Sequence, residues 1–421
     1  MNSKQYSNYI VILKKELIPA MGCTEPIAIA YAAAKARQIL GKMPERMVAV
    51  CSGNIIKNVK GVCVPNADGQ KGVEVAAILG ALAGDPNREL QVISQVPAGT
   101  AQKVRKLVAE KLCTTQLAAG VENLYVRIEV YADEESAAVE IKTKHNHISR
   151  IEKNGETLMA AKEVASAYSG DRSQLNLKDI IEFANKVKME DIENLIGRQI
   201  ECNSAISEEG MSGRYGASVG KIVADHSNGD LVMLAAARAA AGSDARMNGC
   251  ALPVVINSGS GNQGITCTMP VLTYAEAMRA TKEQTYRALV LTNLISIHQK
   301  RFIGDLSAYC GAVSAGTAAA CGIAYLNGDG YDIIGQTIIN TLGNIGGIVC
   351  DGAKASCAAK ISSAVRAGLL GYEMAKSGHV FPFGEGIVEG DYEQTIRNFG
   401  RLAKEGMKET DIEILNMMIN K

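Results

Sequence analysis

Residues 21–40 read MGCTEPIAIAYAAAKARQIL, and the fold of the first part of the chain depends on them. Thr24 is a residue type favoured at the N-cap of a helix, and Pro26 suits the first turn because its missing N–H is not needed there. An alanine-rich run follows. The stretch therefore predicts a helix that begins at Thr24.

Six further segments of the first part of the chain show strand or helix patterns. Strands are expected at 47–51, 90–96, 124–130 and 137–143, and helices at 72–83 and 98–113. The last two strands alternate between apolar and polar residues, which is the period of a half-buried strand. These patterns predict an α/β sandwich-like domain over residues 1–165, with antiparallel strands at one edge.

Helical periodicity replaces the strand signals in the rest of the chain, beginning with the apolar stripe that contains Ile180 and Phe183. Residues 177–421 are therefore expected to form a second, mainly α-helical domain. The predicted fold class is α+β, with the α/β sandwich-like domain first and the helical domain after it.

The composition favours a small molecule as the partner of this protein. The chain has 421 residues and is 47% hydrophobic, and its 44 Lys+Arg balance its 44 Asp+Glu, so no basic field is available to gather nucleic acid or an anionic membrane. It has 42 Gly, no Trp and only 5% aromatic residues. These numbers predict an interior of small and aliphatic side chains in which backbones approach closely.

Three long uncharged stretches, 247–275, 306–328 and 333–349, are interrupted by Asn, Gln, Ser and Thr. A membrane span needs about 20 predominantly apolar residues, so buried helices and loops around a polar centre are the better interpretation. The first residues contain no secretory apolar region, and the odd number of cysteines, 11, argues against a disulfide framework. A cytoplasmic protein is expected, and a homo-oligomer is compatible with a sequence that fixes no oligomeric state.

The strongest local signal for chemistry is a set of cysteines in the second half. Cys350 and Cys357 lie in NIGGIVCDGAKASC, and Cys310 lies in LSAYCGAVSAG. Three thiols without a local histidine suit an iron–sulfur cluster or zinc. Seven residues of continuous helix rise by about 10 Å, so the segment is expected to bend at Asp351-Gly352. The alternative is that all three are buried core cysteines.

A second signal is Cys23, directly before the expected helix start. The N-terminus of a helix binds carboxylates and lowers the pKa of a cysteine, so MGCTEP is able to hold an amino-acid carboxylate beside a base. Glu25 opposes carboxylate binding unless its side chain points away or binds the substrate ammonium. Simple packing of Cys23 is the alternative.

Two polar segments are rich in backbone donors that suit an anion. NSGSGNQG, residues 257–264, is expected to be a flexible loop, and SGNIIKN, residues 52–58, carries Lys57 as a counter-charge. A plain Gly-rich connection is the alternative for the first. His145 and His147, in KTKHNHISR, are interpreted as part of a solvated strand.

Together MGCTEPIAIAYAAAKA, the SGN and KN loop, GVEVAAILGALAGDP, NSGSGNQG and VCDGAKASC resemble the L-cysteine desulfidase family, relatives of the oxygen-sensitive iron–sulfur L-serine dehydratases. The resemblance covers essentially the whole chain. It implies a [4Fe-4S] cluster held by the matching cysteines Cys310, Cys350 and Cys357, with one iron left open. It also implies that the proton-accepting cysteine is Cys23. MGCTEP replaces the Ser/His-rich loop of the dehydratases, which favours cysteine over serine as the substrate.

The function that the resemblance implies is α,β-elimination of L-cysteine to pyruvate, ammonia and sulfide. The open iron acts as a Lewis acid on the departing sulfur, and Cys23 removes the α-proton. The expected substrate-binding residues are Thr24, Glu25, Asn54, Lys57, Asn257, Ser258 and Ser260. The alternatives are an L-serine dehydratase with the same cluster and a cluster-free amino-acid binding protein.

Overall fold

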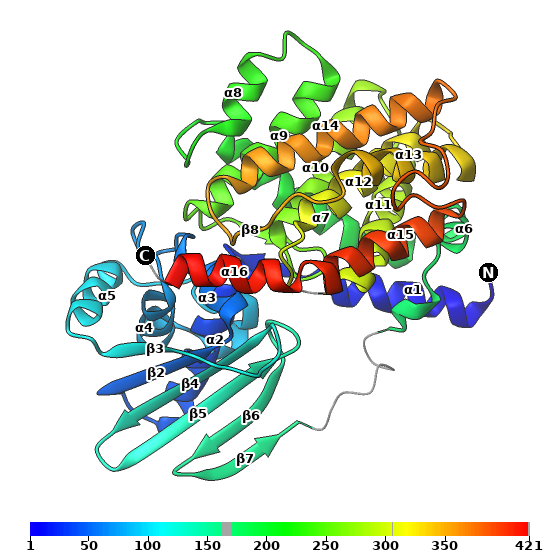
Figure 1. Ribbon diagram of the computed structural model, residues 1–421. Helices are drawn as coiled ribbons and strands as arrows, with labels where there is room; N and C mark the ends of the chain where they lie inside the picture. Colours follow the sequence, from blue (N-terminus) through cyan, green and yellow to red (C-terminus); the bar gives the residue numbers. More distant parts are fainter. Residues whose placement is uncertain (162–169, 305, 420–421) are drawn as a thin grey trace.

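The computed structural model describes residues 1–161, 170–304 and 306–419. The fold is α+β, as the sequence predicts: a mixed six-stranded sheet lies in the N-terminal half, and the C-terminal half is built from helices (Figure 1). The end expected for the first domain, residue 165, lies outside the described residues.

The sheet has the order β3-β2-β4-β5-β6-β7, in which only the β2–β3 pair is parallel. Its strands are β2 (Arg46–Cys51), β3 (Cys113–Leu117), β4 (Tyr125–Ala132), β5 (Glu135–Lys142), β6 (Ile148–Lys153) and β7 (Glu156–Ala160). The accompanying helices are α2 (Thr24–Leu40), α3 (Gly53–Lys60), α4 (Val73–Ala83) and α5 (Thr100–Ala109). Helices α2 and α4 lie on one face of the sheet (Figure 1).

Helix α2 is buried on nearly all sides, because it lies between the sheet and α4. Because most side chains of α2 are small, neighbouring helices approach its backbone closely. Helix α4 contacts it through Gly80. A Cβ at position 80 would lie 2.2 Å from the carbonyl oxygen of Ala30. The close backbone approach predicted from the composition is therefore present at this crossing.

Several local predictions were wrong. The strand expected at 90–96 is the 3-10 helix η1 (Pro86–Gln91) followed by turns, and its apolar pattern reflects the burial of Leu90, Val92 and Ile93 against the core. Strand β3 was missed because it is polar and mostly exposed, as an edge strand often is. Helix α2 begins at Thr24 as expected, but its N-cap is Cys23 and not Thr24.

Both polar segments expected as loops contain helix. Ser52 accepts a hydrogen bond from the N–H of Ile55 and caps α3, so SGNIIKN is a capped helix. In NSGSGNQG only residues 257–260 form a turn. Ser260 is the N-cap of α10, and the remaining residues belong to the first turn of that helix.

The helical half is arranged around α12, which packs against α10, α11, α13 and α14. Its helices are α6 (Leu177–Lys186), α7 (Met189–Gly210), α8 (Val219–Asp225), α9 (Leu231–Met247), α10 (Gly261–Ala277), α11 (Lys282–Ile303), α12 (Gly311–Leu326), α13 (Tyr331–Ile345), α14 (Cys357–Lys376), α15 (Tyr392–Arg401) and α16 (Lys408–Ile419), with the π-helical turn η4 (Leu402–Gly406) before the last. A Cβ at Gly316 or Gly368 would lie 2.7 Å from backbone of the facing helix, so α12 and α14 also meet through glycine.

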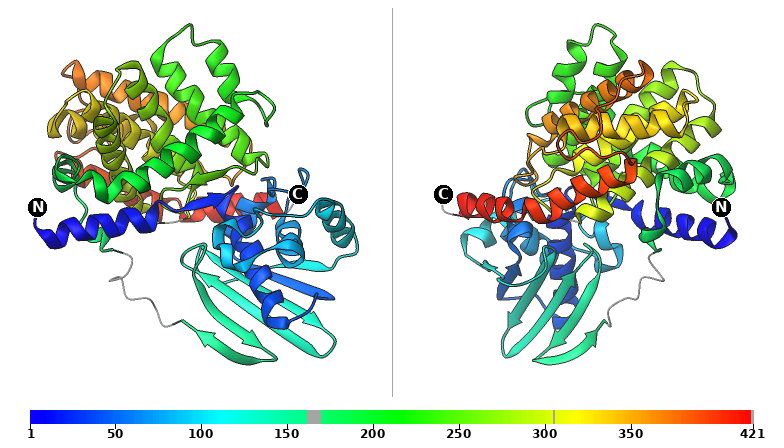
Figure 2. Two further views of the ribbon diagram at one scale, coloured as in Figure 1. Left: turned by 180° about the vertical axis from the view of Figure 1, so that it is seen from behind. Right: turned by 45° about the vertical axis from the view of Figure 1, so that its right-hand side comes forward.

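The two ends of the chain cross between the halves. Helix α1 (Ser3–Glu16) lies along the helical half, where Tyr9 packs against Phe183 (Figure 2). Strand β1 (Pro19–Met21) then pairs antiparallel with β8 (Pro253–Val255). Helix α16 returns to α3, where Leu415 covers Gly53. The N-terminal helix α1 therefore packs on the C-terminal half, and the C-terminal helix α16 packs on the N-terminal half.

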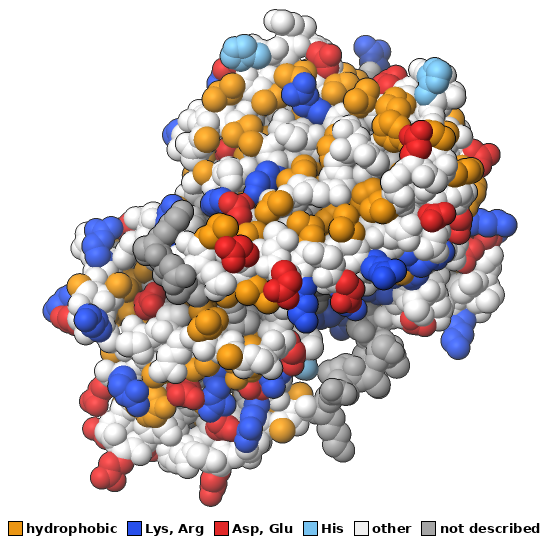
Figure 3. Space-filling model, viewed as in Figure 1, with side chains coloured by type: hydrophobic (Ala, Val, Ile, Leu, Met, Phe, Trp, Pro, Cys, Tyr) orange, Lys and Arg blue, Asp and Glu red, His pale blue; other side chains and the backbone are white. Residues whose placement is uncertain are grey.

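Within the described residues, no helix is long and apolar enough to cross a membrane. On the face seen in Figure 3, acidic and basic side chains are interspersed over both halves, so this face carries no broad field of one sign.

The Gly80 crossing gives a stability prediction. Gly80→Ala should lower the free energy of unfolding by about 1–3 kcal/mol, the usual cost of overpacking a core, because the added methyl meets the backbone of α2 and not a flexible side chain. The measurement is the urea midpoint. Gly330→Ala, where nothing lies within 4 Å of the added methyl, is the control and should change the midpoint little. Equal midpoints for the two variants would contradict the crossing.

Candidate functional site

The β1–β8 pair brings two helix starts together. Strand β1 runs through Gly22 into α2, whose N-cap is Cys23, and β8 runs into the turn before α10. The hydroxyl of Thr24 donates to the carbonyl of Gly259 at 2.9 Å. Residues more than 230 positions apart are thus in contact, and the N-termini of α2 and α10 lie side by side.

Two of the three C-terminal cysteines lie on neighbouring extended segments. Tyr309 and Val349 form an antiparallel bridge, the N–H of Cys310 donates to Ile348 at 2.9 Å, and the N–H of Cys350 donates to Ala308 at 2.6 Å. The thiols of Cys310 and Cys350 are hydrogen-bonded to each other.

The chain then bends where the sequence predicts it. Gly352 adopts a φ of 96°, and a Cβ there would lie 2.5 Å from the carbonyl oxygen of Lys57, so both its conformation and its surroundings require glycine. The bend returns Cys357 toward the other two cysteines, near enough for electrostatic interaction with both.

The electrostatics of this group favour anionic sulfur at one position. The hydrogen bond from Cys310 lowers the pKa of Cys350, and the ammonium groups of Lys57 and Lys360 act in the same direction. That hydrogen bond raises the pKa of Cys310, and burial raises the pKa of Cys357. Cys310 is also the N-cap of α12 and Cys357 is the first residue of α14, so two helix N-termini face the sulfurs.

Cys23 lies beside the third of these cysteines. It is buried and packs with Val62 and Met247, and Ala353 and Cys357 pack against the same small cluster. Its thiol donates to Glu25 Oε2 at 2.8 Å. Burial and the carboxylate of Glu25 raise the pKa of Cys23 well above its ordinary value, so the expected lowering by the helix N-terminus is not the dominant effect.

Glu25 points at Cys23 and not away from it. Its Oε1 accepts from the side-chain amide of Asn58 at 2.9 Å and lies 3.9 Å from Nε2 of His145, while the Thr24 hydroxyl lies 3.2 Å from Oε2. Burial raises the pKa of Glu25, but His145 and the Cys23 thiol outweigh it, and the pKa is lowered. The carboxylate therefore stays ionised inside the protein.

The polar side chains of the 257–260 turn are used to shape the turn. Asn257 donates to Asn293 Oδ1 at 2.9 Å and accepts from Ser296 and Ser258. Ser258 has a φ of 49°, and Ser260 caps α10. These three predicted substrate-binding residues lie next to Thr24 and Cys23, but their side chains are bonded within the protein.

Helix α3 presents Asn54, Lys57 and Asn58 on neighbouring positions of one side. Lys57 is buried and forms an ion pair with Asp411 of α16, so its ammonium group is already paired although it lies near Cys350. The Oδ1 atoms of Asn54 and Asn58 are buried without a hydrogen-bond donor. Asn58, which was not singled out from the sequence, is the member of this helix that reaches Glu25.

Sequence reasoning missed three further residues. His145 is buried beside Glu25 and Gly259, so the solvated-strand interpretation was wrong; it belongs to the turn between β5 and β6. Arg246 is buried near Cys23. The pattern that could have indicated it is a charged residue within the alanine-rich helix LVMLAAARAAAGSDARM. Gln263 is buried against Gly311, next to Cys310. It lies in NSGSGNQG, but it was not among the residues of that segment predicted to bind substrate.

The donor set fits an iron–sulfur cluster. Cys310, Cys350 and Cys357 are free thiols gathered by two helix starts and a glycine bend, and two lysines face them. Among the described residues, no group of three or more His, Cys, Asp or Glu is arranged to hold a metal ion. Cys321 lies in the interior of α12 and contacts the carbonyl of Ile334 instead.

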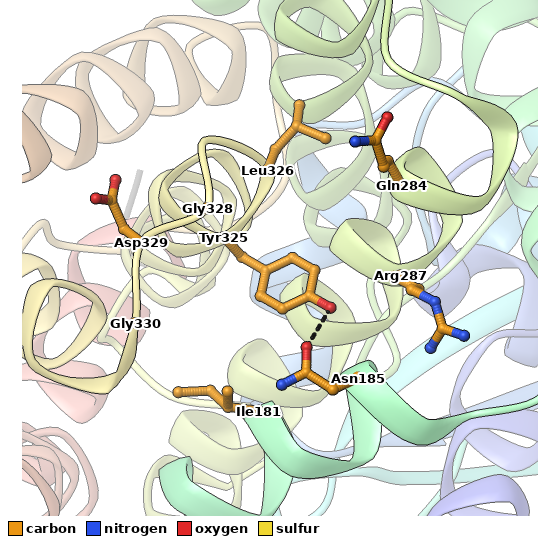
Figure 4. A pocket seen from close by; sticks show the side chains of 9 residues that line it. All are labelled: Ile181, Asn185, Gln284, Arg287, Tyr325, Leu326, Gly328, Asp329 and Gly330. Atoms are coloured by element: carbon orange, nitrogen blue, oxygen red, sulfur yellow. Dashed lines mark hydrogen bonds between the residues drawn. The ribbon is translucent and has the colours of Figure 1, made fainter.

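A hollow of about 390 Å³ lies elsewhere, between α6, α11 and α12 (Figure 4). Tyr325 donates to Asn185 at 2.7 Å across it, and Arg287 is paired with Glu283 and the carbonyl of Ala184. The polar side chains of Tyr325, Asn185 and Arg287 are therefore already paired, and the hollow contributes no residue to the cysteine site.

Comparison with known proteins gives a consistent result. The family model described as serine dehydratase alpha chain matches residues 87–416. A UPF0597 protein of Desulfitobacterium hafniense is 49% identical over 99% of this chain and 97% of its own length. UPF0597 proteins of Finegoldia magna (49% identical, 98% and 100%) and Lachnoclostridium phytofermentans (47% identical, 99% and 100%) are similarly related.

The cysteine geometry predicts which substitutions remove iron. Cys310→Ala, Cys350→Ala and Cys357→Ala should each lose the iron and the visible absorbance of anaerobically purified protein, because a cluster needs all three thiolates. Cys321→Ala should keep both, since its sulfur faces α13. Iron and sulfide analysis with visible spectroscopy measures the outcome, and an intact cluster in any of the first three variants would remove that cysteine from the site.

Proposed function

The chain belongs to the serine dehydratase alpha chain family, and we propose that it is a lyase of the serine dehydratase type that eliminates the β-substituent of a small L-amino acid. The preferred substrate is L-cysteine. The products are sulfide and aminoacrylate, which tautomerises to an imine and hydrolyses to pyruvate and ammonia.

One observation carries the proposal: Cys23 packs in the same small cluster as Cys357. A group able to move a proton thereby stands next to a group of three thiols able to hold a cluster. An elimination needs both a base at the α-carbon and stabilisation of the leaving group at the β-carbon. These two requirements are met by different elements, α2 on one side and the starts of α12 and α14 on the other.

We propose that Cys310, Cys350 and Cys357 hold a [4Fe-4S] cluster. When bound, it supplies a Lewis-acidic iron that stabilises the negative charge of the departing group. Lys57 and Lys360 stabilise the thiolate of Cys350 through their charge. The ion pair with Asp411 holds Lys57 in place for this role.

Cys23 Sγ is the proposed acceptor of the substrate α-proton. Burial and Glu25 raise the pKa of Cys23, so the free protein holds it as a thiol. It must lose the proton of its hydrogen bond to Glu25 Oε2 before it acts as the base. The side-chain amide of Asn58 fixes the other oxygen of the carboxylate. Because Cys23 is buried, bulk water does not compete for its proton.

L-Serine is the second candidate substrate, and the description of the matching family favours it. The local sequence favours cysteine, because MGCTEP stands where the resemblance places the Ser/His-rich loop of the dehydratases.

The substrate is decided by comparing the two amino acids. Anaerobically purified protein should form pyruvate from L-cysteine with a higher kcat/KM than from L-serine, with sulfide released in equal amount. Pyruvate is measured by a coupled lactate dehydrogenase assay and sulfide colorimetrically. Faster turnover of L-serine would make the protein a dehydratase, and no pyruvate from either would reject the lyase.

Cys23→Ala should lose elimination by about 10²-fold or more, the usual effect of removing a positioned base, while iron content and visible absorbance stay as in the wild type. Exchange of the substrate α-hydrogen with deuterated water, followed by NMR, should fall in parallel. Cys113→Ala, which removes a buried thiol from β3, is the matched control.

Two outcomes would contradict this role. A Cys23→Ala protein that exchanges the α-hydrogen at the wild-type rate has another base. Loss of iron from the same variant would instead make Cys23 a cluster ligand.

A further inference from the structure

Arg246 is a buried cation without a counter-ion. The residue is 2% exposed, at the end of α9, and no described carboxylate forms an ion pair with it. Its Nη1 donates to Asn262 Oδ1 at 3.1 Å, while Nε is buried without an acceptor. Burial of a charge is costly unless it is paired and hydrogen-bonded, so a guanidinium in this state lacks an anionic partner.

The guanidinium lies against the start of α10. A Cβ at Gly261 would be 2.3 Å from Nε of Arg246, so glycine at the first position of this helix is what admits the side chain. The N–H groups of Gly261 and Asn262 have no intrahelical acceptor, because they belong to the first turn. A buried cation and the N-terminus of a 17-residue helix therefore converge on one place.

This place adjoins the proposed base. Met247, the neighbour of Arg246, packs with Cys23, and the turn that leads into α10 is bonded to Thr24. Glu25 lies close enough for its charge to interact with that of Arg246, but its oxygens accept hydrogen bonds from Cys23 and Asn58 and none from Arg246. The guanidinium of Arg246 therefore remains able to bind another anion.

We infer that Arg246 and the first turn of α10 bind the α-carboxylate of the substrate amino acid. The inference rests on the proposed function and adds the residue that holds the substrate. A carboxylate in this position places the α-carbon next to Cys23 and leaves the β-substituent to extend toward Cys357 and the other cysteines. Arg246 is thus a binding residue that orients the substrate so that its α-hydrogen faces Cys23.

Two unpaired amide oxygens border the same region and suit the α-ammonium group. Asn58 Oδ1 belongs to the side chain that donates to Glu25, and Gln263 Oε1 belongs to the side chain that lies against Gly311. Both are buried acceptors without donors, whereas Nε of Arg246 is a buried donor without an acceptor. This pattern of one cationic donor and two acceptors matches a zwitterion.

The first test uses unmodified holoenzyme and ligands that have no leaving group. L-Alanine should bind about 10- to 100-fold more tightly than L-alaninamide, the range expected for charge-assisted hydrogen bonds to a carboxylate. Isothermal titration calorimetry under anaerobic conditions measures both. Equal affinities would overturn the inference without any mutation.

The second test removes the guanidinium. Arg246→Gln should bind L-alanine about 10- to 100-fold more weakly and should no longer distinguish it from L-alaninamide, with KM for the reacting substrate raised and iron content kept. Arg238→Gln, on the same helix but paired with Glu276, is the matched control and should bind as the wild type does.

The outcomes separate this inference from the proposed function. An Arg246→Gln protein that keeps the wild-type preference for L-alanine rejects Arg246 as the carboxylate site, even if elimination proceeds. Binding that depends on Arg246 in a protein that forms no pyruvate keeps the site and rejects the lyase. If Arg246→Gln does not fold, Arg246→Lys and the comparison of the two ligands on wild-type protein decide the question.

Discussion

The functional site depends on one short contact, the antiparallel pairing of β1 with β8. Three residues on each side hold together segments more than 230 positions apart. Each strand leads directly into a helix, so the pairing fixes where α2 and α10 begin. The Thr24 hydroxyl on the Gly259 carbonyl then locks the two helix starts at 2.9 Å. Cys23 and Glu25 at the start of α2, and the first turn of α10 beside Arg246, are all placed by this contact.

The interior of small residues is the second requirement, because it lets helix N-termini converge. Glycine admits α4 to α2 and α14 to α12, so these helices cross at short range. Helices α2, α10, α12 and α14 all begin around the cysteines. Each start adds partial positive charge and N–H donors without an intrahelical acceptor. The resulting field suits both anionic sulfur and a substrate carboxylate, and it forms without a large number of basic side chains.

The sequence predicted the parts of the site that are local and missed those that depend on distant packing. The start of α2 and the bend at Asp351-Gly352 were predicted because cap and turn preferences act over a few residues. The pairing of Lys57 with Asp411 was not, since it joins positions 354 apart. The burial of His145 likewise depends on how the β5–β6 turn meets Gly259. The strand prediction at 90–96 was wrong because buried residues in a turn and in a short strand give similar runs of apolar residues in the sequence.

The arrangement of charges explains how a carboxylate can lie beside a site that binds carboxylates. Glu25 accepts hydrogen bonds at both oxygens, from Cys23 and from Asn58, and His145 lies near it. These hydrogen bonds and the charges of His145 and Arg246 stabilise the carboxylate, yet Arg246 forms no ion pair with it or with any other described carboxylate. Had Glu25 and Arg246 formed an ion pair, each would have satisfied the other, and the site would have had neither an oriented thiol nor a free cation. Keeping the two apart costs stability, as a buried unpaired cation must, and this is the kind of cost expected where binding of a ligand supplies the missing partner.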